Sequence, residues 1–550
     1  MIIRKTPARQ HGLHEPFRHE NHPRPVTRRQ LLGAGFLTGP AMVLAPAWLG
    51  SLLKPQSASA LDATITQMQA ECKIQASAGG AAGGPLPFIV IDLAGGANLM
   101  GSEALSGVKG GQMNFLSAAG YSKLGVPGSM IPTSTTFIDT SLGMAFHSDS
   151  AILRGIKTRA QAATLAGVNG VVIPAMSQND TGNNPLNPMY GIAKAAAGGA
   201  GKQYGSLLTL VGTQSSTSGG NSASPASTSV GGSDPTLTPT KIASAADDTG
   251  LVSTSGNAPN PDTLAALASQ AKISSGATAQ ASVTTPAEAA FSNSSLAGTL
   301  IPGAGNTAAD AALKEQVRCA YVKTAYTADS FGSPATLNPD LDTNIVSASG
   351  GIFTTAEYQA DGDIRKAAAV MKLVLNGYAG AGTITLGGYD YHSGNRADGE
   401  LKNAHAGVII GAILDYARRV GRPVMIQVIS DGSLTSTGNV DSSTNGRGKL
   451  GWQGDSQQVA ASLLLAYSPK GRPVMNPAVP GNQIGFCNAD GTVNATSSPA
   501  ANANNLLVQT VMLNWMAANG TVADFANVFP TQGLGAVAAR DALTAFTQIT

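Results

Sequence analysis

Four apolar runs, each closed by a polar or glycine-rich turn, constrain the fold of this 550-residue chain more than any other feature. They read PFIVIDLAGG (87–96), GVVIPAMSQNDTGNN (170–184), TITLGGYDYH (383–392) and PVMIQVISDGS (423–433). Continuous apolar runs of this kind are typical of strands that are buried on both faces of a parallel sheet. We therefore predict that the four runs are parallel strands of one sheet.

Two segments with a helical pattern flank the third run, one before it and one between it and the fourth run. Apolar residues recur at helical spacing over residues 362–377 and 400–420. Asp361 and Asp363 stand at the start of the first segment, where acidic side chains suit the helix dipole, and Gly-Arg-Pro at 421–423 ends the second. This order of helix, strand, helix and strand predicts a β-α-β unit, and hence an α/β fold with helices on the faces of a mostly parallel sheet.

Other parts of the chain are predicted to carry little regular structure. Residues 213–300 include SSTSGGNSASPASTSVGGSDPTLTPT, which cannot bury enough apolar area to offset the cost of ordering. We interpret this stretch as a flexible surface insertion with one short helix at PDTLAALASQAK. Long loops are expected at 432–452 and 469–504, and a late helix at 504–520 that ends at a glycine.

The N-terminal sixty residues have the features of an export signal. TRRQLL at 27–32 matches the twin-arginine pattern, the stretch 31–53 carries no charge, and Ala-Ser-Ala at 58–60 suits a cleavage site. The alternative is an uncleaved membrane anchor, but glycines and prolines interrupt the run. The sequence thus predicts a Tat signal peptide at 1–60 and a single periplasmic or extracellular domain at 61–550, with membrane contact only through an uncleaved signal segment.

The charge balance and the number of histidines limit which partners and which kinds of metal site the chain could have. Residues 1–60 hold eight of the 34 basic side chains and two of the 32 acidic ones, so the remainder has 26 basic and 30 acidic residues. This balance argues against nucleic acid as a partner. Only His147, His392 and His405 remain after residue 60. The three cysteines, Cys72, Cys319 and Cys487, allow one disulfide and a spare thiol, and the sequence leaves the pairing open.

Polar residues follow the predicted strands at their carboxyl ends, where open parallel sheets bind ligands. Asp92 falls at the strand end of the first run, residues 177–181 at that of the second, Asp390 and His392 at that of the third, and Asp431 at that of the fourth. Each also has a purely structural interpretation. Asp92 and Asp431 precede glycines and suit turns, and the 390–392 stretch suits a polar turn. Ligand binding and turn formation both stay open for these residues.

The chain resembles a family of Tat-exported bacterial proteins of unknown function that have an alkaline-phosphatase-like fold. The matching pieces are TRRQLL, IDLAGGANLM, GGYDYHSGN, VISDGS and GWQGDSQQVA. The family's Asp-x-His is matched by Asp390 and His392, but its Ser-Glu-Phe-Gly-Arg is Ser-Asp-Gly-Ser at 430–433. Its Gly-x-Asp-His-Gly is Gly-Asp-Ser at 454–456, which keeps Asp455 and lacks the histidine. The resemblance implies a three-layer αβα sandwich with long low-complexity surface insertions.

Enzymes of the wider superfamily hold two metal ions with carboxylates and about three histidines, and a hydroxyl at a helix start attacks a phosphate or sulfate ester. A complete two-zinc site is not expected here, because His147 and His405 are interpreted as structural residues. A carboxylate-rich site fits better and would suit Mg²⁺, Mn²⁺ or Ca²⁺ more than Zn²⁺. Its predicted ligands are Asp92, Asp390, His392, Asp431 and Asp455.

Thr181 is the first candidate for the nucleophile and Ser177 the second, since they follow the second strand where a helix begins. The alternative is that residues 179–181 only cap that helix. Two functions therefore stay open. One is an exported, metal-dependent hydrolase of phosphate or sulfate esters. The other is a non-catalytic relative that binds envelope or secretion-related protein partners.

Overall fold

The computed structural model describes residues 85–177, 186–196, 208–213, 240–245, 334–392 and 396–549. Several sequence predictions fall outside these residues: the export signal at 1–60, nearly all of the insertion at 213–300 with its short helix, and the side chains of Thr181, Cys72 and Cys319. Cys487 is described, and its thiol is free and buried.

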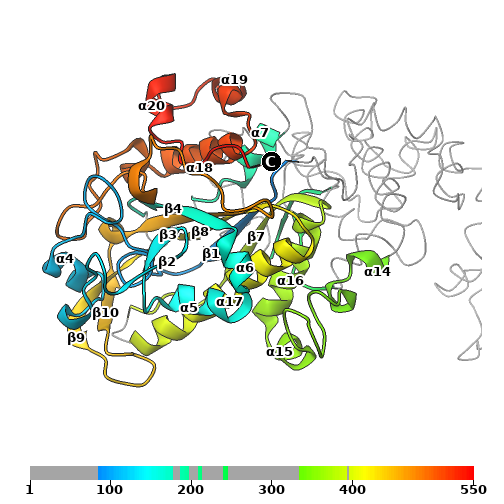
Figure 1. Cartoon of the computed structure of the whole chain (residues 1–550), viewed down its shortest axis with the longest axis horizontal. Coiled ribbons are helices and arrows are strands. Elements are labelled where there is room, and N and C mark those ends of the chain that lie inside the picture. The colour runs from blue at the N-terminus through cyan, green and yellow to red at the C-terminus, as the bar shows by residue number, and fades with distance from the viewer. Residues whose placement is uncertain are drawn as a thin grey trace, which may run out of the picture. The chain divides into compact units, whose positions relative to one another are not determined.

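A seven-stranded sheet forms the centre of the described part, in the order β4-β11-β8-β1-β7-β5-β6 (Figure 1). The strands are β4 (Val168–Pro174), β11 (Ala461–Tyr467), β8 (Val424–Ser430), β1 (Phe88–Leu93), β7 (Ala379–Leu386), β5 (Leu208–Gly212) and β6 (Thr240–Lys241). Of these strands, β11 alone runs opposite to the others, pairing antiparallel with β4 and β8. The four predicted runs supply β1, β4, β7 and β8, all pointing the same way, so the prediction of a mostly parallel sheet is confirmed.

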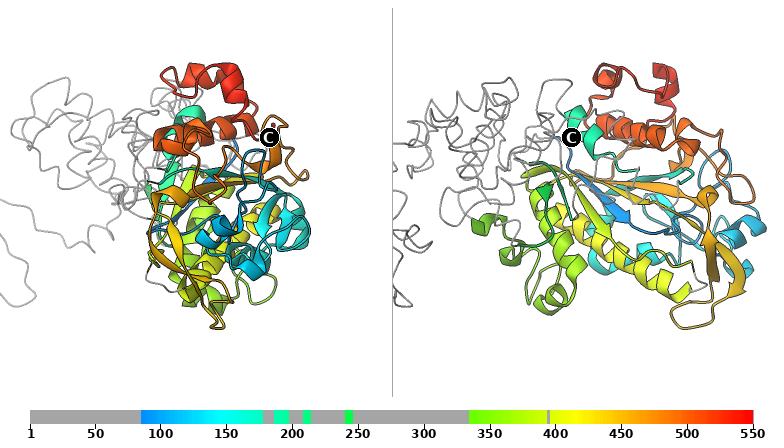
Figure 2. Two further views of the ribbon diagram at one scale, coloured as in Figure 1. Left: turned by 90° about the vertical axis from the view of Figure 1, so that its left-hand side faces the viewer. Right: turned by 180° about the vertical axis from the view of Figure 1, so that it is seen from behind.

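Helices cover both faces of the sheet (Figure 2). The helices α5 (Ala151–Arg159), α16 (Gly362–Leu375) and α17 (Arg396–Arg419) pack on one face, and α7 (Met189–Ala196) and α18 (Asn504–Ala518) pack on the other. The strand β1 alternates between the two cores: Ile91 belongs to the first and Val90 to the second. The described part is therefore a mixed α/β structure built on a sheet that is buried on both sides.

The remaining elements are shorter. A second small sheet pairs β9 (Leu434–Val440) with β10 (Leu450–Asp455), and a third pairs β2 (Ile138–Leu142) with β3 (Met144–His147). The other helical segments are α4 (Ala118–Lys123), η2 (Gly128–Met130), α6 (Ala162–Ala166), α14 (Pro334–Leu337), η4 (Pro339–Leu341), α15 (Thr355–Ala360), η5 (Gln457–Val459), η6 (Pro480–Asn482), η7 (Pro499–Asn502), η8 (Val522–Asp524), α19 (Phe525–Val528) and α20 (Val537–Asp541). Among the described helices, none combines the length and hydropathy that a membrane span requires.

The hairpin β9–β10 corrects one prediction, because it occupies the segment 432–452 that was expected to be a loop. The residues of β9 are mostly polar and half-exposed, so the strand carries no alternating apolar pattern. Its partner β10 contributes Trp452, which is buried against the start of α17. Tertiary packing thus forms a hairpin that local preference does not predict.

Candidate metal centre at the carboxyl ends of the strands

The ends of β1, β7 and β8 meet at one edge of the sheet, which we call the rim. The backbone N–H of Gly95, after β1, donates to Asp431 Oδ1 after β8 at 2.8 Å. The N–H of Tyr389, after β7, donates to the carbonyl of Ala94 at 3.0 Å. These bonds join segments that are about 300 positions apart in the chain, so the strand ends converge as a parallel sheet requires.

Three side chains at the rim form a group that is able to hold a metal ion, and we call it the rim site. One ligand atom from each of Asp390, His392 and Asp455 lies within 4.8 Å of the other two. Divalent ions bind oxygen and nitrogen at about 2.0–2.6 Å, so atoms around one ion lie at most about 5 Å apart. The side chains of Asp390 and His392 are 51% and 41% exposed, and their Oδ1 and Nε2 atoms are 2.7 Å apart.

Two of the five predicted ligands do not join this group among the described residues. Asp92 lies within β1 rather than after it, level with Thr385 and Ile429, and is only 1% exposed. Its position in the alternating strand directs it to the same face as Val90, which packs toward α18. Asp431 accepts a hydrogen bond from the turn after β1 and thereby fixes that turn.

Ser177, the second nucleophile candidate, comes close to the rim site along the backbone. Its N–H donates to the carbonyl of Gln457 at 3.1 Å, and Gln457 is two residues beyond Asp455. Ser177 is only 4% exposed. The end of β4 therefore borders the rim site, although Ser177 itself is covered in this conformation.

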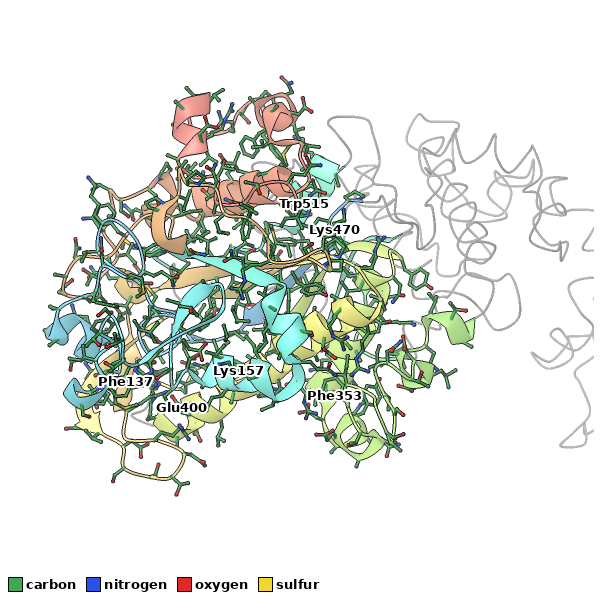
Figure 3. All side chains as sticks on the ribbon, in the orientation of Figure 1. Phe137, Lys157, Phe353, Glu400, Lys470 and Trp515 are labelled. Atoms are coloured by element: carbon green, nitrogen blue, oxygen red, sulfur yellow. The ribbon has the colours of Figure 1, made fainter. Side chains whose placement is uncertain are left out.

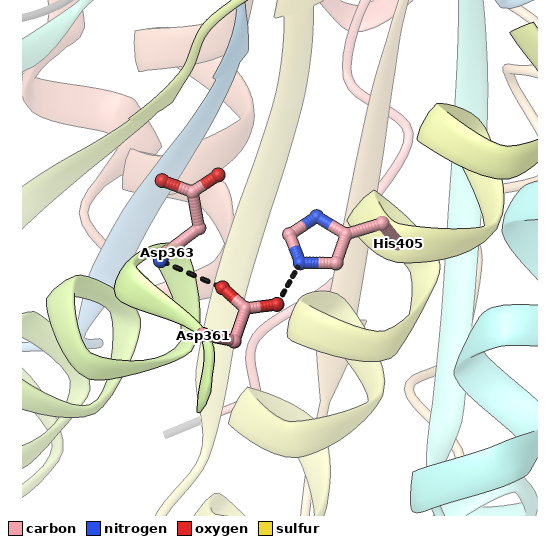
Figure 4. Close-up of side chains that lie close together, drawn as sticks. All are labelled: Asp361, Asp363 and His405. Atoms are coloured by element: carbon pink, nitrogen blue, oxygen red, sulfur yellow. Dashed lines mark hydrogen bonds and ion pairs between the residues drawn. The ribbon is translucent and has the colours of Figure 1, made fainter. Parts of the chain in front are cut away.

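A second group of acids with a histidine lies at the start of α16: Asp361, Asp363 and His405 (Figure 4). Asp361 caps the helix, because its Oδ1 accepts from the N–H groups of Asp363 and Ile364, and its Oδ2 is 2.7 Å from His405 Nε2. Burial alone would raise the pKa of Asp361, but these hydrogen bonds hold the pKa below its usual value. Asp363 is paired with Lys366 at 2.8 Å.

The roles of this group are thus structural. The prediction that acidic residues begin this helix is confirmed by the cap at Asp361. His405, interpreted from the sequence as a structural residue, is 31% exposed and bonds to Asp361 at the start of α16. His147 is fully buried, and its Nε2 lies 2.9 Å from the carbonyl of Met130.

Beneath the rim, the start of α17 carries a buried ionic network that the sequence analysis missed. Glu400, labelled in Figure 3, accepts from Arg396 Nη2 at 2.7 Å and from Lys449 Nζ at 2.8 Å on Oε1, and from Arg154 Nη2 at 2.8 Å on Oε2. The side chains of Arg396 and Lys449 are each only 1% exposed. The spacing of Arg396 and Glu400, four residues apart in a helix, is the one local sign of this network.

The charges and burial in this network shift the pKa values of two carboxyl groups, those of Glu400 and Glu103. Burial would raise the pKa of Glu400, but the charges of Arg396 and Lys449 hold it below its usual value. Glu103 lies nearby and is fully buried; burial first, and then the charge of Glu400, raise its pKa. Asn403 Nδ2 donates to Glu103 Oε1 at 2.9 Å. The network therefore shifts the pKa values of these two carboxyl groups in opposite directions.

Protein-family profiles, curated proteins and solved structures gave no match to the chain. The function must therefore be inferred from the site itself.

Proposed function

We propose that this protein is an exported, divalent-metal-dependent hydrolase of phosphate or sulfate esters with an alkaline-phosphatase-like fold. The proposal rests mainly on one observation: Asp390, His392 and Asp455 gather at the edge of the sheet where open parallel sheets bind ligands. Two carboxylates and one imidazole are suitable ligands for Mn²⁺ or Zn²⁺, and, through their oxygens, for Mg²⁺ or Ca²⁺. A bound ion would polarise an ester oxygen and neutralise the developing charge.

The chain's own residues favour an anionic ester as the substrate. A divalent ion bound at the rim site would balance the charges of its two carboxylates. Lys402 adds a positive charge to the loop that carries Asp390 and His392, because a Cβ atom on Gly388 would lie 2.8 Å from Lys402 Nζ, and this ammonium also lies 5.7 Å from the ring centre of Tyr389. An anion would satisfy both the metal and this ammonium. Thr181 and Ser177 stay the candidates for the attacking hydroxyl.

The second candidate function is a non-catalytic envelope protein that binds a metal and a protein partner at the same rim. The burial of Ser177 favours it, as does the presence of a single imidazole among the ligands of the rim site. Export through the twin-arginine pathway is part of both proposals and rests on the N-terminal sequence.

The decisive experiment compares the two acidic groups in the full-length protein. Mn²⁺ binding is measured by calorimetry, and turnover of an aryl phosphate and an aryl sulfate is measured with and without Mn²⁺. Asp455→Asn is expected to abolish binding and turnover, whereas Asp363→Asn, from the group at α16, is expected to change neither. Binding that Asp455→Asn leaves intact would refute the rim site. Mn²⁺ binding without turnover of either ester would instead support the non-catalytic protein.

A further inference from the structure

Tyr391 lies between two ligands of the rim site and points the opposite way. It is 4% exposed, whereas the side chains of Asp390 and His392 are about half exposed. Adjacent side chains of an extended segment point in opposite directions. The burial of Tyr391 therefore turns both of its neighbours outward.

The hydroxyl of Tyr391 connects two other segments of the site. It accepts from the backbone N–H of Asn98, which follows the turn after β1, and donates to Asn403 Oδ1 on α17, each at 3.1 Å. Asn403 is itself held, since its amide donates to Glu103. A buried hydroxyl that satisfies both of its partners fixes the position of the loop more firmly than ring packing alone.

The ring of Tyr391 connects the same loop to the strand that carries Asp455. It packs against Trp452 with ring centres 6.4 Å apart, and Trp452 lies three residues before Asp455 in β10. Arg396 also packs over the ring of Trp452, with its Cζ 4.4 Å from the ring centre. Gly399 makes room for this arrangement, because a Cβ there would lie 2.9 Å from Tyr391 Cε2 and 3.0 Å from Trp452 Nε1.

From these contacts we infer that Tyr391 is the positioning residue of the rim site, setting Asp390 and His392 at the correct distance from Asp455 without touching the metal. This inference rests on the proposed function, since it assigns a role within that site. Groups that hold metal ligands in place typically contribute 10- to 100-fold to metal affinity. Tyr391 would act in this way through its hydroxyl.

The test is Tyr391→Phe, with Tyr416→Phe as the matched control. Tyr416 also has a buried hydroxyl with two partners, donating to Asp342 Oδ2 at 2.7 Å and accepting from Asn376 Nδ2 at 2.8 Å, but it lies near the far end of α17. Both variants should lose similar stability. Only Tyr391→Phe should weaken Mn²⁺ binding, by about 10-fold or more.

A second readout does not depend on the metal. In the metal-free protein, hydrogen exchange of the backbone over residues 387–392 should accelerate in Tyr391→Phe and not in Tyr416→Phe. Equal Mn²⁺ affinity in the two variants, or unchanged exchange in this loop, would overturn the inference. If the wild-type protein binds no Mn²⁺, the proposed function fails, and the exchange measurement alone decides whether Tyr391 positions the loop.

Discussion

Neutralising Glu400 should destabilise the protein far more than neutralising an exposed acid. Its carboxylate faces three cations, and two of them, on Arg396 and Lys449, are almost completely buried. In Glu400→Gln both charges would keep their desolvation cost, while Arg396 would lose this counter-charge and Lys449 would retain Asp149 at 3.3 Å. Removing one partner of a buried ion pair costs about 3–5 kcal/mol, and Arg154, with a side chain 31% exposed, adds little.

The matched control is Asp363→Asn, whose pair with Lys366 has side chains 32% and 37% exposed. Exposed pairs of this kind contribute about 0–1 kcal/mol. The free energy of unfolding would be measured by urea denaturation followed by circular dichroism. Adding Lys449→Met to Glu400→Gln completes a double-mutant cycle, and the two residues should couple by about 0.5–3 kcal/mol because they are in direct contact. A loss in Glu400→Gln no larger than in Asp363→Asn would refute this account of the network.

Two further predictions concern the same region. Because the pKa of Glu103 is raised above 4.5 in the folded state by burial and by Glu400, the folded protein retains a proton that the unfolded chain releases as the pH rises above about 4.5. The stability of wild type relative to Glu103→Gln should therefore fall as the pH rises above about 4.5, and a pH-independent difference in urea midpoint would contradict this. Gly95→Ala should cost about 2 kcal/mol or more and weaken Mn²⁺ binding, because Gly95 has φ +138° and a Cβ there would lie 2.4 Å from the backbone nitrogen of Asp390. Gly387→Ala, in the loop after β7 with open space around it, should change neither the free energy of unfolding nor the Mn²⁺ affinity, measured by denaturation and calorimetry.

The sequence predicts those parts of the fold that burial and local order determine. Four apolar runs and the β-α-β order are enough to define β1, β4, β7 and β8 and their common direction. A parallel sheet then requires their carboxyl ends to share an edge, so Asp390 and His392 could be placed at that edge from sequence. The sequence could not show that Asp92, unlike Asp390 and His392, lies within its strand, because the run alone does not show that the strand continues to Leu93.

The features that the sequence does not predict depend on contacts between residues that are far apart in the chain. The run at 461–467 is apolar and buried, but nothing local shows that β11 is antiparallel between β4 and β8. Glu400 and Arg154 are 246 positions apart, so their pairing has no local signature. The hairpin β9–β10 is defined by contacts such as that of Trp452 with Arg396 rather than by its own polar sequence.

The hairpin explains why the rim site belongs to the tertiary structure and not to any single motif. Asp390 and His392 come from the loop after β7, whereas Asp455 ends β10, and β10 is held to that loop through Trp452 and Tyr391. A metal bound by these three side chains would cross-link the two segments in the folded state alone. It would stabilise the fold by about 2.7 kcal/mol at a concentration 100 times its dissociation constant. Since the acids at α16 are already engaged as a helix cap and an ion pair, the described residues favour one metal ion rather than two.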